Sequence, residues 1–359
     1  MRFILGEAAV IFDPVLDIFR GKAITIPPLD GAFRPNTRLD DAPVLAALSA
    51  PDNLAVLSGG LAASRGASLV AISGRSEPEW LETFSSPVTA IAVSHEGEIA
   101  VGLESGDLMI GGVEASLPAE IGCITALAYG AGGTLWLANG SANHPPSGWV
   151  TDLMELGRSG SVWRRGAGET GFRAVARGLG FPYGLHPEAE GVIVSESWRH
   201  RLVRITPEGR ATTVLGHLPG YPARLSPASG GGAWLSIFAP RNRLIEFVLE
   251  ETRYREDMLA EVPREFWIAP ALSSGRSFLE PLQCGGIKTM GIHKPWAPSR
   301  SCGLVVRLDA QMRPLFSLHS RSNGKRHGTV SALEHQGQLI VASKGGDCVM
   351  AIDLPSEGH

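Results

Sequence analysis

The residues that most often mark a reactive or metal-binding site are scattered in this sequence rather than grouped. The four cysteines, Cys123, Cys284, Cys302 and Cys348, are far apart and form no Cys-x-x-Cys pair. Structural zinc sites need thiolates at short spacing, and small disulfide-bonded domains need a dense set of cysteines. We therefore expect reduced thiols and no zinc site.

A glycine-rich run, ASGGGAW at 228–234, could belong to a phosphate-binding loop. A P-loop requires a lysine after its glycines and a helix that begins there, because the lysine and the backbone N–H groups hold the phosphates together. This run leads instead into an apolar, strand-like stretch. It predicts a hairpin turn.

Any site must be positioned by the rest of the chain, whose composition is typical of a folded protein rich in turns. Hydrophobic residues make up 44% of the 359 residues and charged residues 19%, and 44 glycines and 25 prolines lie outside any low-complexity tract. Turns distributed in this way separate many short elements, which favours an all-β fold.

The formal net charge of −4, without a basic block, argues against nucleic-acid binding.

The sequence gives no sign of a membrane protein. No stretch approaches the roughly 20 apolar residues of a membrane span. The opening MRFILGEAAVIFDP is interrupted by Gly6 and Glu7 and lacks the longer apolar core of a secretory signal. We expect a soluble, cytoplasmic protein without a membrane partner, and the sequence leaves the oligomeric state open.

A degenerate repeat runs through the chain. A glycine-rich or polar turn followed by a β-branched or aromatic run recurs at 66–73, 97–103, 132–140, 191–197, 231–236 and 337–343. Most of these runs have a second apolar run before them and a third after them, a pattern typical of propeller blades. We predict one all-β domain over residues 1–359, a six-bladed β-propeller around a central channel. Residues 22–28 would complete the last blade and close the ring.

Residues 250–300 interrupt the repeat. The stretch 250–272 combines charged and apolar residues at helical spacing before loops that contain proline. We expect a short helical and loop insertion between blades five and six, over one mouth of the channel. Its role as a lid or as a surface decoration stays open.

Four stretches of the chain, 138–165, 176–205, 215–248 and 302–343, resemble the strictosidine-synthase-like branch of the gluconolactonase and paraoxonase superfamily. The most specific elements of the resemblance are the turns FPYG at 181–184 and LPGYP at 218–222. Members of this superfamily are six-bladed propellers, which agrees with the repeat.

The hydrolases of this superfamily hold a calcium ion in the channel with carboxylate and amide ligands, and the ion can polarise a lactone or ester carbonyl. The resemblance places Asp52, Thr125, Tyr183 and the pair Ala223–Arg224 at the ligand positions. The guanidinium of Arg224 would bring a fixed positive charge into the space of the ion. We therefore expect a metal-independent protein with no cofactor.

Strictosidine synthase condenses an amine with an aldehyde, and the resemblance implies a catalytic glutamate on the inner strand of the last blade. In HGTVSALEHQG at 327–337 this position falls at or near Val330, whereas Glu334 lies nearer the turn. The specific alkaloid reaction is therefore not supported.

The side chains at the four ligand positions could point into the channel. In that case Asp52, Thr125, Tyr183 and Arg224 meet in one polar pocket, with His327 near its rim. A carboxylate or an imidazole can move protons near neutral pH, while a phenol and a guanidinium can stabilise developing negative charge. We therefore take Asp52, Tyr183, Arg224 and His327 as candidate catalytic residues.

The candidate substrate-binding residues are Thr125, Tyr183, Arg224 and His144, which could overhang the mouth. Because a guanidinium pairs with carboxylates and phosphates, the preferred hypothesis is an enzyme acting on a small anionic metabolite by hydrolysis or by forming or breaking a carbon–nitrogen bond. Two alternatives stay open. One is a calcium-dependent lactonase or esterase, and the other is a non-catalytic ligand-binding propeller in which Asp52 and Arg224 form a structural salt bridge.

Overall fold

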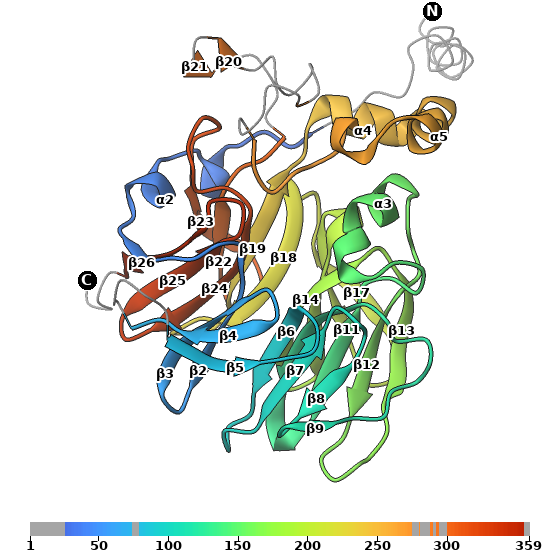
Figure 1. Cartoon of the computed structure of the whole chain (residues 1–359), viewed down its shortest axis with the longest axis vertical. Coiled ribbons are helices and arrows are strands. Elements are labelled where there is room, and N and C mark those ends of the chain that lie inside the picture. Colours follow the sequence, from blue (N-terminus) through green and yellow to red (C-terminus); the bar gives the residue numbers. More distant parts are fainter. Residues whose placement is uncertain are drawn as a thin grey trace, which may run out of the picture.

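The computed structural model of the chain describes residues 26–73, 79–274, 280 and 300–354, together with the backbone of 288–289 and 292–293. Six four-stranded antiparallel sheets surround a central channel, which confirms the prediction of an all-β, six-bladed propeller (Figure 1). The first strand of each sheet contacts the first strands of its two neighbours. These six strands form the inner wall.

The first three blades are formed by residues 51–179. From the inner strand outward they consist of β2 (Pro51–Leu57), β3 (Gly60–Arg65), β4 (Ser68–Ala71) and β5 (Glu79–Thr83); β6 (Val88–Val93), β7 (Ile99–Leu103), β8 (Leu108–Ile110) and β9 (Val113–Glu114); and β10 (Ile124–Tyr129), β11 (Leu135–Asn139), β12 (Gly160–Arg165) and β13 (Arg173–Leu179).

The other three blades include the ring closure. They consist of β14 (Pro182–Glu188), β15 (Gly191–Glu196), β16 (Arg201–Ile205) and β17 (Ala211–Leu215); β18 (Gly220–Pro227), β19 (Ala233–Pro240), β22 (Leu304–Leu308) and β23 (Pro314–His319); and β24 (Thr329–His335), β25 (Gln338–Ser343), β26 (Cys348–Asp353) and β1 (Val44–Ala47). Five of the six predicted repeat runs coincide with second strands, and the run at 66–73 contains the third strand β4.

The predicted closing segment was wrong. The strand that completes the last blade is β1, which pairs antiparallel with β26, whereas residues 26–28 form no strand and 22–25 lie outside the described residues. The chain before β1, with the short helices η1 (Gly31–Phe33) and α2 (Arg38–Asp41), packs against β23 of the fifth blade. Asn36 Nδ2 donates to the Ser317 carbonyl oxygen at 2.8 Å. This segment therefore covers an edge strand of blade five before the chain enters the last blade as β1.

The helical insertion lies inside blade five, not between blades five and six as predicted. The chain leaves β19, forms α4 (Arg243–Glu250), α5 (Thr252–Glu261), η5 (Arg264–Phe266) and the hairpin strands β20 (Lys288–Thr289) and β21 (Ile292–His293), and returns at β22. The helical spacing predicted α5. It missed α4, which begins after the N-cap Asn242.

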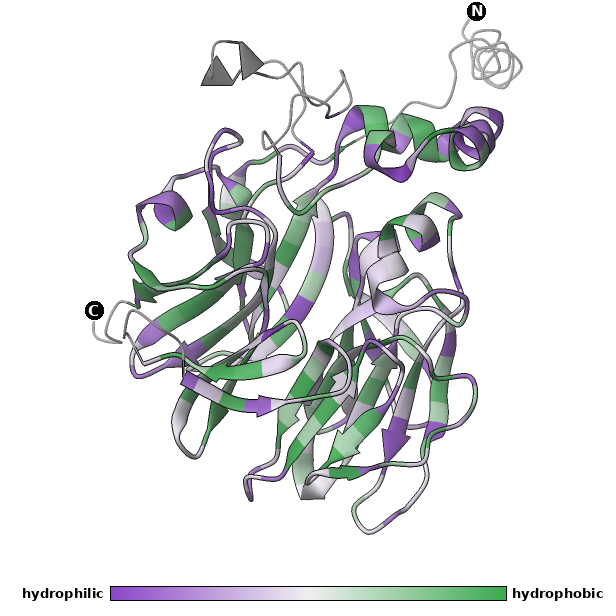
Figure 2. Cartoon of the chain, viewed as in Figure 1, coloured by the Kyte–Doolittle hydropathy of each residue, from purple (hydrophilic) through white to green (hydrophobic). Residues whose placement is uncertain are grey.

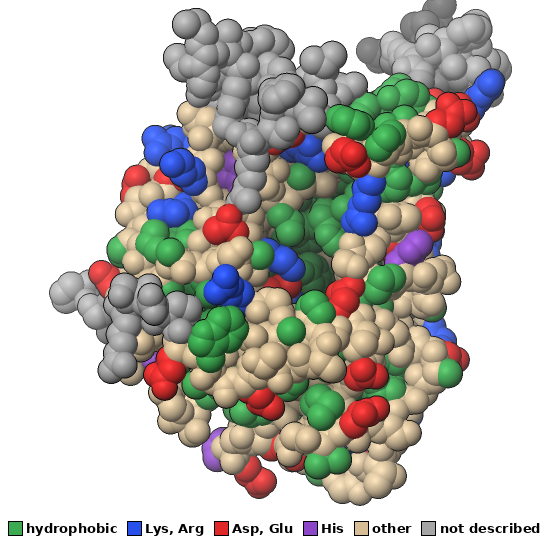
Figure 3. Space-filling view, in the orientation of Figure 1, with side chains coloured by type: hydrophobic (Ala, Val, Ile, Leu, Met, Phe, Trp, Pro, Cys, Tyr) green, Lys and Arg blue, Asp and Glu red, His purple; other side chains and the backbone are tan. Residues whose placement is uncertain are grey.

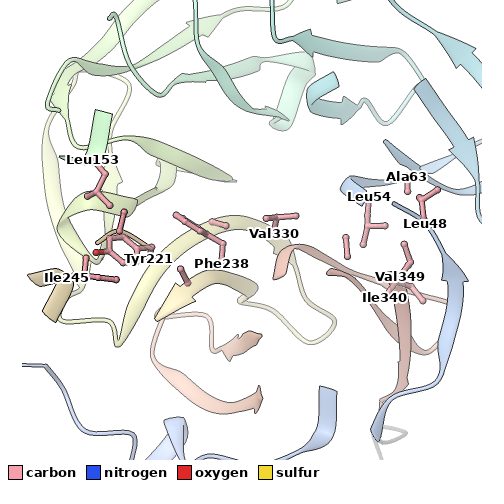
Figure 4. Close-up of a cluster of buried hydrophobic side chains, with 14 of the residues drawn as sticks. Leu48, Leu54, Ala63, Leu153, Tyr221, Phe238, Ile245, Val330, Ile340 and Val349 are labelled. Carbon is pink, nitrogen blue, oxygen red and sulfur yellow. The ribbon is translucent and has the colours of Figure 1, made fainter. Parts of the chain in front are cut away.

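Helix α4 is anchored in the main hydrophobic core. Its apolar face buries Ile245 and Val248, and Figure 4 shows Ile245 beside Tyr221 and Leu153. Leu153 belongs to α3 (Trp149–Met154), and Figure 1 places α3 and α4 at the same end of the propeller. Both helices therefore belong to the wall at that end of the channel.

Hydrophobic residues concentrate within the strands of the blades, while the outer helix α5 is mostly hydrophilic (Figure 2). Buried clusters between neighbouring sheets hold the blades together, as expected for a propeller. The remaining single-turn helices are η2 (Ala131–Gly133), η3 (Pro146–Gly148) and η4 (Ser197–Arg199). No helix among the described residues combines the length and apolar character needed to cross a bilayer.

Candidate active site

Each inner strand carries a β-bulge near its start. The pairing register shifts on all six inner strands, leaving extra residues at Asp52–Asn53, Thr89, Thr125, Tyr183, Ala223–Arg224 and Val330. A bulge breaks the alternation of side chains and re-aims the extra residue. The bulges therefore explain why five of these side chains, on five different blades, line one cavity.

The cavity lies in the channel and has a volume of about 560 Å³. Asp52, Thr89, Thr125, Tyr183 and Arg224 from the bulges line it. Trp149, Phe181, Phe238 and Leu272 contribute apolar wall, and Glu104 and Lys344 contribute charge. The space-filling view shows a hollow in this face with apolar side chains inside and charged side chains near its mouth (Figure 3). A cavity of this size accommodates a drug-sized molecule.

A carboxylate between two cations forms the charged end of the cavity. Arg224 Nη1 lies 2.6 Å from Asp52 Oδ1, and Lys344 Nζ donates to Asp52 Oδ2. The side chains of Asp52 and Arg224 are 13% and 12% exposed, so water screens this pair weakly. The structure therefore brings Asp52 and Arg224 together as predicted. It also places Lys344 at this carboxylate, which the sequence analysis did not predict.

Arg224 also ties the inner strands together. Its Nη2 donates to the Thr89 carbonyl oxygen at 2.6 Å, and Nη1 reaches the carbonyl oxygens of Asp52 at 3.3 Å and Val330 at 3.4 Å. One side chain from β18 thus contacts β2, β6 and β24. Arg224 also lines a second cavity of about 80 Å³. Arg224 therefore lies between two spaces within the channel.

The charges fix the protonation states of the group. Burial acts to raise the pKa of Asp52, but the positive charges of Lys344 and Arg224 outweigh it and lower that pKa. Burial acts to lower the pKa values of Arg224 and Lys344, but the charge of Asp52 raises both. Asp52 is therefore a weak base, and the two cations stay protonated near neutral pH.

Tyr183 connects the charged end to an aromatic wall. Its ring centroid lies 4.9 Å from Arg224 Cζ, 5.8 Å from the Phe181 ring and 5.7 Å from the Phe238 ring. Burial raises the pKa of Tyr183, the charge of Asp52 adds to the rise, and the two cations offset part of it. The phenol therefore stays protonated and can donate a hydrogen bond.

Thr125 lies in the cavity wall as predicted, but its hydroxyl is bonded to the backbone. It lies 2.6 Å from the carbonyl oxygen of Pro182 and 3.2 Å from that of Ala138. A hydroxyl has one proton to donate, so donation to a substrate by this group would have to break a bond between the third and fourth blades. Its geometry indicates a structural role.

The structure does not bring either predicted histidine into the cavity wall. His327 is 2% exposed, and its ring nitrogens lie 2.7 Å from Ser301 Oγ and 2.9 Å from the Arg321 carbonyl oxygen. The ring of His144 points to Glu155 Oε2 at 2.7 Å, while the nearby Pro146 and Ser147 line the cavity. The expected placement of His327 at the rim is therefore wrong, because the ring lies in a buried polar contact.

Sequence reasoning missed two charged residues of the wall, Glu104 and Lys344. Each follows the second strand of its blade, Glu104 after β7 and Lys344 after β25, and Gly66 lines the cavity from the same place after β3. The repeat itself carried this signal. The residue directly after each predicted central strand forms a second set of candidate wall positions.

The donor set does not fit the calcium ion that the superfamily resemblance implies. Calcium requires six to eight oxygen ligands. At the expected positions Asp52 already accepts from two cations, Thr125 is bonded to the backbone, and the guanidinium of Arg224 occupies the middle of the group. No cluster of three or more metal-ligating side chains occurs within the described ranges.

No protein-family model and no curated protein matches the chain. Among solved structures, a protein described as a gluconolactonase aligns with a TM-score of 0.54 at 13% identity, over 87% of this chain and 91% of the other. A gluconolactonase from Xanthomonas campestris aligns with a TM-score of 0.53 at 13% identity, over 89% and 92%. Virginiamycin B lyase from Staphylococcus aureus aligns at 0.44 and 11% identity, over 84% and 80%. The two alignments with TM-scores above 0.5 support the propeller fold, and function must be argued from the site.

Proposed function

We propose that this protein is a metal-independent enzyme that converts a small anionic organic molecule in the central channel. The observation that carries the proposal is the Lys344–Asp52–Arg224 group, which sets two protonated cations and one carboxylate at the end of a largely apolar cavity. A cation there favours an anionic substrate.

The chemistry best supported is polarisation of a carbonyl group. The protonated phenol of Tyr183 can donate to an oxygen that gains negative charge, the role that an oxyanion hole plays in acyl transfer. This favours opening of a lactone or ester over carbon–nitrogen chemistry. The gluconolactonase from Xanthomonas campestris, which has the same fold, supports this preference, while membership in the strictosidine-synthase-like branch stays a prediction.

Hydrolysis also requires a base to activate water, and Asp52 is poorly suited because two cations lower its pKa. The second carboxylate in the wall is Glu104, whose Oε1 accepts the Ser147 N–H at 2.9 Å. That bond fixes the carboxyl group at the cavity. We assign proton removal from the attacking water to Glu104.

The test is a panel of lactones and esters that carry a carboxylate, assayed in EDTA and again in calcium with wild type, Tyr183→Phe and Tyr129→Phe. Tyr129 bonds Glu98 and does not line the cavity, so it is a matched control. Removing one oxyanion donor costs about 100-fold in kcat. We expect this loss in Tyr183→Phe and wild-type rates in Tyr129→Phe. Equal rates in both variants would contradict the mechanism, and activity that requires calcium would contradict metal independence.

A non-catalytic ligand-binding propeller is the second candidate. The observation that favours it is that both oxygens of Asp52 are held by cations, which removes the most buried carboxylate of the wall from proton transfer. Anion binding without turnover of any compound in the panel would support this candidate over the enzyme.

A further inference from the structure

The charged end of the cavity is not electrically balanced. Within this group Arg224 and Lys344 carry two positive charges and Asp52 carries one negative charge, which leaves a net charge of +1. The second carboxylate of the wall, Glu104, is bonded to the Ser147 N–H and not to either cation. Arg224 and Asp52 are almost completely buried, and Lys344 is 31% exposed. Uncompensated charge in an apolar site is unfavourable, so the site is suited to receive one negative charge from a ligand.

The two cations differ in the donors that they can offer. Arg224 directs both terminal nitrogens at Asp52, Thr89 and Val330, and its Nε is buried without a hydrogen-bond partner among the described residues. The terminal donors of the guanidinium are therefore committed to the inner strands. An ammonium group has three donors. Among the described residues, Lys344 Nζ uses one of them, to Asp52. Lys344 therefore has donors left for a ligand in the cavity that it lines.

The position of Lys344 is fixed by its turn. Its backbone N–H donates to the Gly328 carbonyl oxygen at 2.9 Å, and Gly345 N–H donates to the His327 carbonyl oxygen at 3.1 Å. A Cβ atom on Gly345 would overlap the carbonyl oxygen of Leu272, so this close approach requires glycine. The turn presents the ammonium group beside the apolar wall without a large movement.

That wall is aromatic. Trp149 and Phe238 line the cavity with ring centroids 5.2 Å apart, and Tyr183 and Phe181 continue the surface toward the charged end. Aromatic walls gain most from flat apolar groups, which can stack or pack edge to face. The cavity thus combines a place for one negative charge with a place for a flat apolar body.

We propose that Lys344 is the residue that selects the substrate, and that the substrate is an organic monocarboxylate with a flat apolar body. The carboxylate binds Lys344 Nζ, and the body lies against Trp149, Phe181 and Phe238. Arg224 holds Asp52 and the inner strands in place without contacting the ligand. This inference rests on the proposed function, because it specifies the substrate class of the same site.

The test measures binding by calorimetry with three probes of similar shape: 1-naphthylacetate, the neutral 1-naphthylacetamide and the cationic 2-(1-naphthyl)ethylamine. The proteins are wild type, Lys344→Met, Lys344→Arg and Lys325→Met. Lys325 is an exposed lysine that does not line the cavity, so it controls for a general loss of charge. Melting curves check that each variant folds, and Lys344→Gln replaces Lys344→Met if the latter does not.

We expect wild type and Lys325→Met to bind the carboxylate at least about tenfold more tightly than the amide, and the amine most weakly. Lys344→Met should lose this preference while its Kd for the amide stays within about twofold of wild type. Lys344→Arg should keep the preference. Equal binding of carboxylate and amide by wild type, or an unchanged preference in Lys344→Met, would overturn the inference.

The readout separates this inference from the proposed function. Lysine-dependent carboxylate binding without turnover of any panel compound would sustain the inference and refute the enzyme. Turnover of the carboxylate-bearing lactones or esters by wild type, with no preference for 1-naphthylacetate over the amide, would sustain the enzyme and overturn the role of Lys344.

Discussion

Replacing Arg224 by methionine tests whether this guanidinium holds the channel together. Methionine keeps most of the apolar stem but removes the bonds to Asp52 Oδ1 and the Thr89 carbonyl oxygen, both 2.6 Å long. Breaking a buried ion pair costs about 3–5 kcal/mol. Asp52 keeps Lys344 as a partner, which reduces the cost, while the unpaired Thr89 carbonyl adds about 1–3 kcal/mol. We expect a loss of about 3–5 kcal/mol.

This loss converts into a measurable melting shift. Unfolding entropy is about 2.1 cal/mol/K per residue. For 359 residues this gives about 0.75 kcal/mol/K, so Tm should fall by about 4–7 °C. Differential scanning calorimetry of Arg224→Met against wild type measures the shift. The control is Arg173→Met, because Arg173 is exposed on β13 and should leave Tm within about 1 °C.

A double-mutant cycle with Asp52→Asn identifies the source of the loss. If Arg224 acts largely through Asp52, the two changes together should lower Tm by less than the sum of the separate changes. A Tm change below about 1 °C in Arg224→Met would refute the assignment of Arg224 as the cation that ties the inner strands, and strict additivity in the cycle would refute its coupling to Asp52.

Two further predictions concern the wall and the anchor of α4. Thr125→Val should lower stability by about 1–3 kcal/mol, because the Pro182 carbonyl oxygen loses its donor, and should leave the Kd for 1-naphthylacetate unchanged; a weaker Kd would restore Thr125 as a binding residue. Burial acts to raise the pKa of Glu246, but hydrogen bonds from His200 and Arg241 lower it from 4.5 to about 2. The resulting stability, about 3 kcal/mol, is present above pH 4.5 and is lost as pH falls toward 2, so Tm of wild type should fall more steeply over that interval than Tm of Glu246→Gln. Parallel curves would contradict this.

The sequence predicted the fold because each blade repeats the same physical pattern. Five predicted runs fell on the second strands, the most buried strands of their blades, where apolar residues must recur. The closing strand escaped prediction because Val44–Ala47 is a short edge strand with little burial, and its pairing with β26 joins segments about 300 residues apart.

The site was only partly predictable. Asp52, Thr125, Tyr183 and Arg224 could be placed because the resemblance aligned the turns of the inner strands, and the bulges do bring these residues to one cavity. Lys344 could not be found in this way, since it lies outside an inner strand.

His327 shows the opposite error. Because His327 precedes the inner strand of the last blade, the sequence predicts that it lies near the channel. Hydrogen bonds inside the loop, however, decide where its ring points. Its Nδ1 contacts Ser301 Oγ and its Nε2 contacts the Arg321 carbonyl oxygen. Its backbone carbonyl accepts from Gly345, so the residue supports the turn that carries Lys344.

The most direct test of a metal-independent anion site is a set of thermal melts in EDTA, in calcium and in 1-naphthylacetate. A ligand that binds only the native state stabilises it by RT ln(1 + [L]/Kd), about 2.7 kcal/mol at 100 times Kd. We predict coincident curves in EDTA and calcium, and a Tm increase of about 3–4 °C with saturating 1-naphthylacetate that is absent in Lys344→Met. A fall of several degrees in EDTA that calcium reverses, with no response to the carboxylate, would contradict the assignment of Arg224 and Lys344 as the cations of this channel.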